Sequence, residues 1–303
     1  LHLLIMSSAI HRDAVFEYML EIGFDEEQFT ADGKSALVLA CEYGRSRIVN
    51  LCLEHGLNPN QPDYHNTSCL QYAILGNFAP IVRTLLQYEA DSNQVGFEGM
   101  SPLHDVAATG NLEIVTILIE ESKMETDIDI NVQDQTYGYT PVMVAARNGF
   151  DEIVLKLCTL MCSVEIVDWN NWSAAHHCCL ANNPDTVNHL REMVADFDAV
   201  DYLGNTPMHV AAENGNHLAL RELLSLGAIP SWQNTQGNQP AHLAAMNNHV
   251  DCLNLLVRYD EHIGRVNYEH RTPLGMAKFH VAEEARVFLE EWFTKVAGPE
   301  TRN

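Results

Sequence analysis

The run from His176 to Cys179 contains two imidazoles followed by two thiols, the side chains that most often bind zinc. Structural zinc is held by four Cys or His ligands in a tetrahedron, so this run is the first candidate for chemistry. Adjacent residues on a helix diverge by about 100°, however, and four in a row do not all face one ion. We therefore expect a packing role and no bound metal. This run is the only feature of the sequence that supports a metal or cysteine enzyme as an alternative.

Cys158 and Cys162 are four residues apart and share one face if their segment is helical. Cys158 falls at an apolar position of that segment, which favours packing over reactivity. The sequence contains no GxxxxGK[ST], GxGxxG, GxSxG or HExxH motif, and its acids are scattered without a marked pair. We therefore expect a non-enzymatic protein with no catalytic residues and no cofactor.

Eight segments of the chain begin alike, at steps of 33 residues with one step of 39. Their first residues are Ser35, Ser68, Ser101, Thr140, Ser173, Thr206, Gln239 and Thr272. A further step back reaches His2, a degenerate ninth copy. A fixed step predicts a repeat protein, in which each unit buries its apolar face only against its neighbours.

Each segment carries local signals for a turn, a helix start and a helix end. Two residues before the Ser/Thr position stands Gly or Asn, or His270 in the last copy, which marks a turn with positive φ. Ser or Thr caps the first helix, Pro suits its first turn, and Gly or Asn ends it. Small pairs such as Ala211-Ala212 let a neighbouring helix approach closely. A second helix follows, with apolar residues at helical spacing.

This pattern resembles the ankyrin repeat, whose signature is T-P-L-H-x-A-A at a period of 33, over nearly the whole chain. The resemblance implies an all-α solenoid of stacked helix-turn-helix units with β-hairpin-like loops on one edge. We expect one solenoid over residues 1–297 and a tail over 298–303. Its repeats start near 1, 33, 66, 99, 138, 171, 204, 237 and 270. The six extra residues form a loop near 122–129, and the charged helix after Val281 is a capping repeat.

In the ankyrin family the hairpin tips vary and project toward a concave binding face. Five of the eight copies carry an aromatic residue four positions before the Ser/Thr position. Exposed aromatics are the usual anchors of interfaces. The alternative is that they pack against neighbouring hairpins. The predicted partner-binding residues are Tyr64, Phe97, Tyr137, Tyr139, Trp169, Trp172, Tyr202, Tyr268, Tyr43 and Arg147. We expect Tyr137, Tyr139, Trp169 and Trp172 to form one patch, and we expect first-helix residues such as Glu213 and Met246 to share their face.

The chain carries 41 acidic and 17 basic residues, a formal net charge of −24. This charge argues against binding nucleic acid or an anionic membrane, and no long apolar run predicts membrane insertion. It fits a protein partner with a basic segment, although it also serves solubility. The stretch from Glu98 to Asp134 holds nine acids and one lysine. It is either a contact site for such a partner or a solvated loop.

The eight cysteines show no disulfide-like spacing and no secretory signal precedes them, which favours a cytoplasmic, intracellular protein. The leading hypothesis is a non-enzymatic scaffold that binds a protein partner along the concave face. One alternative is a structural subunit of a large cytoskeletal or ciliary (axonemal) assembly, because Asn238–Met246 and Thr272–Lys278 are similar to axonemal ankyrin proteins. Another is the substrate-recognition arm of a larger multidomain protein.

Overall fold

The computed structural model describes residues 16, 18, 29–121, 128–260 and 263–296. Backbone contacts divide the chain into two compact units, residues 1–141 and 142–303. The predicted first repeat lies almost entirely outside the described residues. Most of the predicted insertion, residues 122–127, and the tail over 298–303 also lie outside them.

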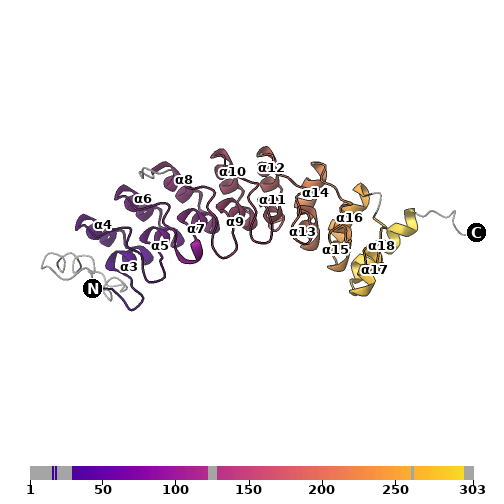
Figure 1. Cartoon of the computed structure of the whole chain (residues 1–303), viewed down its shortest axis with the longest axis horizontal. Coiled ribbons are helices and arrows are strands. Elements are labelled where there is room, and N and C mark those ends of the chain that lie inside the picture. Colours follow the sequence, from indigo (N-terminus) through magenta and orange to yellow (C-terminus); the bar gives the residue numbers. More distant parts are fainter. Residues whose placement is uncertain (1–15, 17, 19–28, 122–127, 261–262, 297–303) are drawn as a thin grey trace, which may run out of the picture. The chain divides into compact units, whose positions relative to one another are not determined.

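The described part of the first unit consists of helix pairs. They are α3 (Ala36–Glu42) with α4 (Ser46–Glu54), α5 (Cys69–Leu75) with α6 (Ala79–Gln87), and α7 (Pro102–Thr109) with α8 (Leu112–Glu121). A 3-10 turn, η1 (Phe97–Gly99), precedes α7. The first helices α3, α5 and α7 pack in one row, and the second helices α4, α6 and α8 pack in another (Figure 1).

The second unit repeats the same arrangement. Its pairs are α9 (Pro141–Asn148, which begins at the unit boundary) with α10 (Asp151–Thr159), α11 (Ala174–Cys178) with α12 (Pro184–Glu192), α13 (Pro207–Glu213) with α14 (His217–Ser225), α15 (Pro240–Met246) with α16 (Val250–Tyr259), and α17 (Pro273–Phe279) with α18 (Glu283–Val296). Neighbouring second helices pack from α10 to α18, and neighbouring first helices pack from α11 to α17 (Figure 1). The all-α repeat fold is confirmed. Within the described ranges there is no strand, and no helix is long and apolar enough to cross a membrane.

The predicted helix starts are confirmed. The Ser68 hydroxyl accepts a hydrogen bond from the Gln71 N–H at 3.2 Å, and the Gln71 side chain accepts one from the Ser68 N–H. Such reciprocal caps satisfy N–H groups that have no partner inside the helix. Proline occupies the first turn of α7, α13, α15 and α17, where its missing N–H is not needed.

The predicted turns and helix ends are confirmed by positive φ angles. All eight residues two positions before a cap have φ between 60° and 79°. The residues that end the first helices also lie in the left-handed region, among them Val281 at φ 59°. A β-branched side chain is unfavourable in that region, because its Cβ crowds the following carbonyl. Val281 is therefore a strained position in the last repeat.

The small-residue pairs lie in the buried core of the first-helix row. Ala145, Ala146, Ala211 and Ala212 are fully buried. The apolar residues of the second helices, such as Leu253, close the core from the other side. In each unit the core therefore lies between the two helix rows and continues from one repeat to the next, as the repeat pattern predicts.

The signature histidines link each repeat to the hairpin of the next. The backbone N–H of each cap donates to Nδ1 of its histidine, so that nitrogen is an acceptor and Nε2 carries the proton. Nε2 then donates to the carbonyl just before the following cap. The acceptors are Tyr139 for His104 (2.8 Å), Asn205 for His176 (3.1 Å), Asn238 for His209 (2.9 Å) and Arg271 for His242 (3.1 Å). Burial lowers the pKa of all four and brings that of His209 and His242 to about 4.

Candidate partner-binding surface

The hairpin tips are fixed by buried Asp and Asn side chains. Oδ1 of Asp168 accepts hydrogen bonds from the backbone N–H groups of Asn170 and Trp172, both at 2.8 Å. Equivalent residues make the same turn in other copies, namely Asp63, Asp201, Asn234 and Asn267. The sequence pattern carried a signal for them that was missed, since Asp or Asn recurs five residues before the cap. These turns hold the tip residues in one orientation.

The predicted tip aromatics project from these turns and are largely exposed. The exposed fractions are 76% for Tyr64, 57% for Phe97, 53% for Tyr137, 54% for Trp169, 73% for Tyr202 and 69% for Tyr268. The Tyr64 and Tyr268 rings nevertheless contact the neighbouring hairpin where the space is tight. A Cβ added to Gly33 would collide with the Tyr64 ring, and one added to Gly237 would collide with Tyr268. The tips therefore support one another and still present aromatic surface to solvent.

The second aromatic of each predicted pair has a different environment. Tyr139 is half-buried and stacks on Tyr137, with ring centroids 5.1 Å apart. Trp172 is half-buried as well, and its indole N–H donates to Oδ2 of Asp201 at 3.0 Å. The Tyr137–Tyr139 pair lies in the first unit and Trp169 with Trp172 in the second. That all four form one patch stays a prediction.

The exposed sides of the first helices lie beside the tips. Tyr43 follows α3 and is about one-third exposed, and Arg147 is exposed near the end of α9. We use the name hairpin face for the surface that the tips and these helix sides form in each unit. The role of these residues in binding stays a prediction, and the structure supplies the surface on which it depends.

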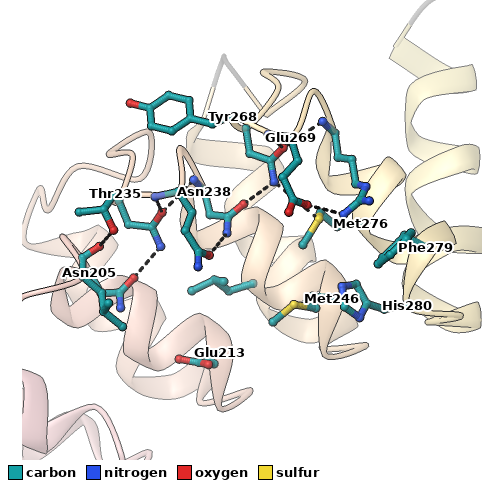
Figure 2. A pocket seen from close by; sticks show the side chains of 16 residues that line it. Asn205, Glu213, Thr235, Asn238, Met246, Tyr268, Glu269, Met276, Phe279 and His280 are labelled. Carbon is teal, nitrogen blue, oxygen red and sulfur yellow. Dashed lines mark hydrogen bonds and ion pairs between the residues drawn. The ribbon is translucent and has the colours of Figure 1, made fainter.

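The hairpin face of the second unit contains a groove of about 670 Å³. Figure 2 shows Tyr268 and Thr235 above it on the hairpins, Met246 and Met276 on its floor, and Phe279 with His280 at one end. Its remaining lining residues are Leu203, Asn205, Glu213, Asn234, Gln236, Asn238, Leu243, Asn267, Glu269 and Arg271. The groove thus combines an apolar floor from α15 and α17 with a polar wall from successive hairpins.

The polar wall of this groove is hydrogen-bonded in a row. Asn234 Nδ2 donates to Asn205 Oδ1 at 2.8 Å, and Asn267 Nδ2 donates to Asn238 Oδ1 at 2.7 Å (Figure 2). At the end of the row, the Arg271 guanidinium pairs with Glu269 and lies 3.6 Å from the centroid of the Phe279 ring. These contacts fix the wall before any ligand binds, which lowers the entropy lost on binding.

The hairpin face of the first unit contains a smaller pocket of about 360 Å³. Its lining residues are His65, Thr67, Gln71, Tyr72, Leu75, Phe97, Met100 and Asp105. Asp105 stands four residues after its cap, where five other repeats have an apolar residue (Leu39, Val144, Val210, Leu243 and Met276) and two have Tyr72 and His177. Among the eight copies an acid stands at this position only here, a signal in the sequence that was missed. Within the acidic stretch, Asp105 and Asp134 are buried rather than solvated.

The run from His176 to Cys179 is part of the packed core. His177 pairs with Asp168 at 3.1 Å, and both side chains are buried. Burial lowers the pKa of His177, although the hydrogen bond to Asp168 opposes this. Cys178 Sγ donates to the Ala175 carbonyl at 3.0 Å, while burial raises the pKa of the Cys179 thiol well above its ordinary value. In the part of the chain that the structure describes, no three His, Cys, Asp or Glu residues are grouped to hold a metal ion.

Comparisons with known proteins agree with the fold. A family model described as ankyrin repeats (3 copies) matches residues 1–96, 91–168, 159–231 and 209–290. The crystal structure of the ankyrin repeat domain of Bcl-3 is similar, with a TM-score of 0.61 and 22% identity over 75% of this chain and 99% of that domain. At this identity the likeness shows the fold alone.

Curated relatives are longer proteins. A probable E3 ubiquitin-protein ligase, XBOS33 of Oryza sativa subsp. japonica, is 30% identical over 187 residues, which are 58% of this chain and 34% of the relative. The palmitoyltransferase ZDHHC13 of Homo sapiens is 26% identical over 226 residues, 73% of this chain and 35% of the relative. The chain spans about a third of the length of these relatives. The matched model, the capped helix pairs and the histidine links together show that the chain belongs to the ankyrin repeat family.

Proposed function

We propose that the chain is a non-enzymatic interaction module that binds a protein segment along its hairpin face. The observation that carries this proposal is the groove of about 670 Å³ in the second unit, with its apolar floor and prearranged polar wall. Tyr268 and Phe279 border this groove and are 69% and 60% exposed. Large exposed aromatics beside an apolar floor favour a protein ligand, because such surfaces gain most from being covered.

The partner segment that fits this groove is apolar with basic flanks. Leu243, Met246 and Met276 form a floor for apolar side chains. Glu213 is an exposed acid at the groove edge, and Glu269 adds a second one that is partly neutralised by Arg271. The net charge of −24 also favours a basic partner and accelerates its approach. Of the other predicted anchors, Trp169 and Tyr202 are exposed on the hairpin face of the second unit, and Tyr64, Phe97 and Tyr137 are exposed on that of the first.

A second proposal concerns the setting in which the module works. The relatives named as a ligase and a palmitoyltransferase are about three times as long as the region that resembles this chain. This supports a role as the recognition arm of a larger protein. The eight cysteines are buried free thiols, which is consistent with a cytoplasmic location. The alternative, a structural subunit of a cytoskeletal or axonemal assembly, is supported by the similarity of Asn238–Met246 and Thr272–Lys278 to axonemal ankyrin proteins.

Photo-crosslinking tests the groove directly. A photoreactive amino acid replaces Met246 in the groove of the full chain, and a second version carries it at Tyr259, an exposed residue near the end of α16 outside the groove. We expect protein adducts from a cell extract at Met246 that are absent at Tyr259 and that disappear when Tyr268→Ala is added. Identical adducts at both positions, or adducts that are insensitive to Tyr268→Ala, would contradict the proposal.

A further inference from the structure

The small pocket of the first unit contains a buried carboxyl group whose setting is unusual. Asp105 is only 6% exposed, and it lines the pocket of about 360 Å³ between α5 and α7. Gln71 Nε2 donates to Oδ2 of Asp105 at 2.9 Å. Burial raises the pKa of this carboxyl group to about 7, and the Gln71 hydrogen bond offsets only part of the effect. Among the residues that the structure describes, no cation contributes to this pKa, so the buried carboxylate has no countercharge from that part of the chain.

The chain's own nearby lysine is engaged elsewhere. The Lys34 ammonium pairs with Glu42 at 2.8 Å and lies 4.6 Å from the centroid of the Tyr72 ring. Tyr72 also lines the pocket, and its hydroxyl donates to Asp63 rather than to Asp105. The Tyr72 ring thus already accepts one cation over its face, as aromatic rings do. Lys34 therefore does not neutralise Asp105, and among the described residues no ion pair to Asp105 competes with a cation from a partner.

The other walls of the pocket suit a cation that carries apolar surface. Phe97 is 57% exposed and meets the edge of the His65 ring, with ring centroids 6.5 Å apart. Leu75 and Met100 add aliphatic surface beside it. A guanidinium group is planar and weakly hydrated, stacks on aromatic rings and pairs with carboxylates, whereas an ammonium group is strongly hydrated. The combination of ring walls and a buried acid therefore favours arginine over lysine.

We propose that this pocket receives an arginine side chain of the partner protein, with the guanidinium against Asp105 and its plane on the Phe97 ring. The proposal rests on the proposed function, because the pocket lies on the hairpin face, and it adds the chemistry of one contact. Pairing with the guanidinium supplies the charge that the buried carboxylate lacks. The same contact fixes where this arginine of the partner lies along the hairpin face of the first unit.

A short peptide tests this contact without knowledge of the partner. The probe is N-acetyl-Ala-Arg-Ala-amide, and its matched control replaces arginine with citrulline, a neutral group of the same shape. Binding to the full chain is followed by the methyl NMR signals of Leu75 and Met100, which line the pocket. We expect the arginine peptide to shift both signals and the citrulline peptide to bind about tenfold more weakly or worse. Equal binding of the two peptides, or unmoved methyl signals, would overturn the proposal.

Variants assign the effect to Asp105 and to the ring wall. Asp105→Asn should abolish the difference in affinity between the two peptides. Phe97→Ala should weaken binding of the arginine peptide, and it should leave the fold intact because Phe97 is exposed. Glu113→Gln is the matched control, because Glu113 is an exposed acid of α8 outside the pocket, and it should change nothing. An undiminished preference for arginine in folded Asp105→Asn would contradict the assignment.

Two further probes test whether the ligand is an arginine side chain of a protein, and this test is independent of the proposed function. Tighter binding of the lysine peptide, or of free L-arginine, would contradict an arginine side chain of a protein as the ligand. The groove of the second unit is tested independently through Met246 and Tyr268. Failure at Asp105 with crosslinks retained at Met246 would therefore remove this inference and leave the proposed function standing.

Discussion

The indole N–H of Trp172 donates a hydrogen bond to Oδ2 of Asp201, 3.0 Å away at the base of the next hairpin. The Trp172 ring also stacks on His176, with ring centroids 5.9 Å apart. Trp169 lies three residues earlier at the tip and is 54% exposed. Both tryptophans are predicted from the sequence to be partner-binding anchors. In the structure Trp172 joins adjacent hairpins, whereas Trp169 faces solvent.

The two tryptophans should respond differently to truncation. We expect Trp172→Ala to lower the free energy of unfolding by about 1–3 kcal/mol, because it removes buried ring surface and a hydrogen bond to a charged group. Trp169→Ala should change stability by less than about 0.5 kcal/mol. Thermal unfolding of both variants checks this, and equal losses would show that Trp169 also supports the hairpins.

Stability should fall as the solution is acidified below neutrality. Burial brings the pKa of His209 and His242 to about 4, below the value of about 6.5 in an unfolded chain. Between these values the unfolded chain binds protons that the native histidines do not, so stability decreases as pH falls through that window. At pH 5 the loss should be about 1–2 kcal/mol for each histidine.

His209→Gln isolates this effect from the many acids of the chain. The stability difference between the wild type and His209→Gln should shrink from pH 7 to pH 5, because only the wild type loses stability through His209. A difference that stays constant over this range would contradict a neutral, buried imidazole. An NMR titration of the His209 ring gives its pKa independently.

Asp105 should have the opposite pH dependence. Its pKa is raised to about 7 in the folded chain, so the native state holds a proton that the unfolded state releases above about pH 4. The contribution of Asp105 to stability therefore decreases as pH rises toward 7. We expect Asp105→Asn to stabilise the chain at pH 8 by about 1–3 kcal/mol and to have a smaller effect at pH 5. Melting temperatures at the two pH values test this, and a variant that is less stable at pH 8 would contradict it.

Val281 is a position where a substitution should stabilise the last repeat. Its φ of 59° is unfavourable for a β-branched residue, and its side chain is 81% exposed. Asparagine occupies the equivalent position in other repeats, for example Asn248 at φ 63°. We expect Val281→Asn to add about 1 kcal/mol. Val287→Asn, an exposed site inside α18, is the control and should bring no gain in thermal unfolding.

Local signals made much of the fold predictable. Ser68, Gly204 and Pro207 act through their own backbone or that of the next few residues, so their roles follow from sequence alone. The same holds for the spacing of the repeats, because each unit must stack on an equivalent one.

The candidate site was less predictable because it depends on contacts between repeats. Trp172 meets Asp201 and Gln71 meets Asp105, pairs that are 29 and 34 residues apart. The repeat spacing identifies which residues lie at the hairpin tips, but it does not indicate which of their side chains form hydrogen bonds to the next repeat. The pocket at Asp105 also needs residues from two repeats, and only the unusual residue type at that position pointed to it.

The groove beside Tyr268 is the proposed binding site for a protein partner. The most direct test titrates a partner captured at Met246 against the wild type, Tyr268→Ala and Tyr259→Ala, with the melting temperature measured on the same samples. Both tyrosines are exposed in the second unit, at 69% and 54%, but only Tyr268 lines the groove. We expect Tyr268→Ala to weaken binding by about 2 kcal/mol, or about thirtyfold, with little change in melting temperature, and Tyr259→Ala to bind as the wild type does. Unchanged affinity in Tyr268→Ala, or equal losses in both variants, would contradict the claim.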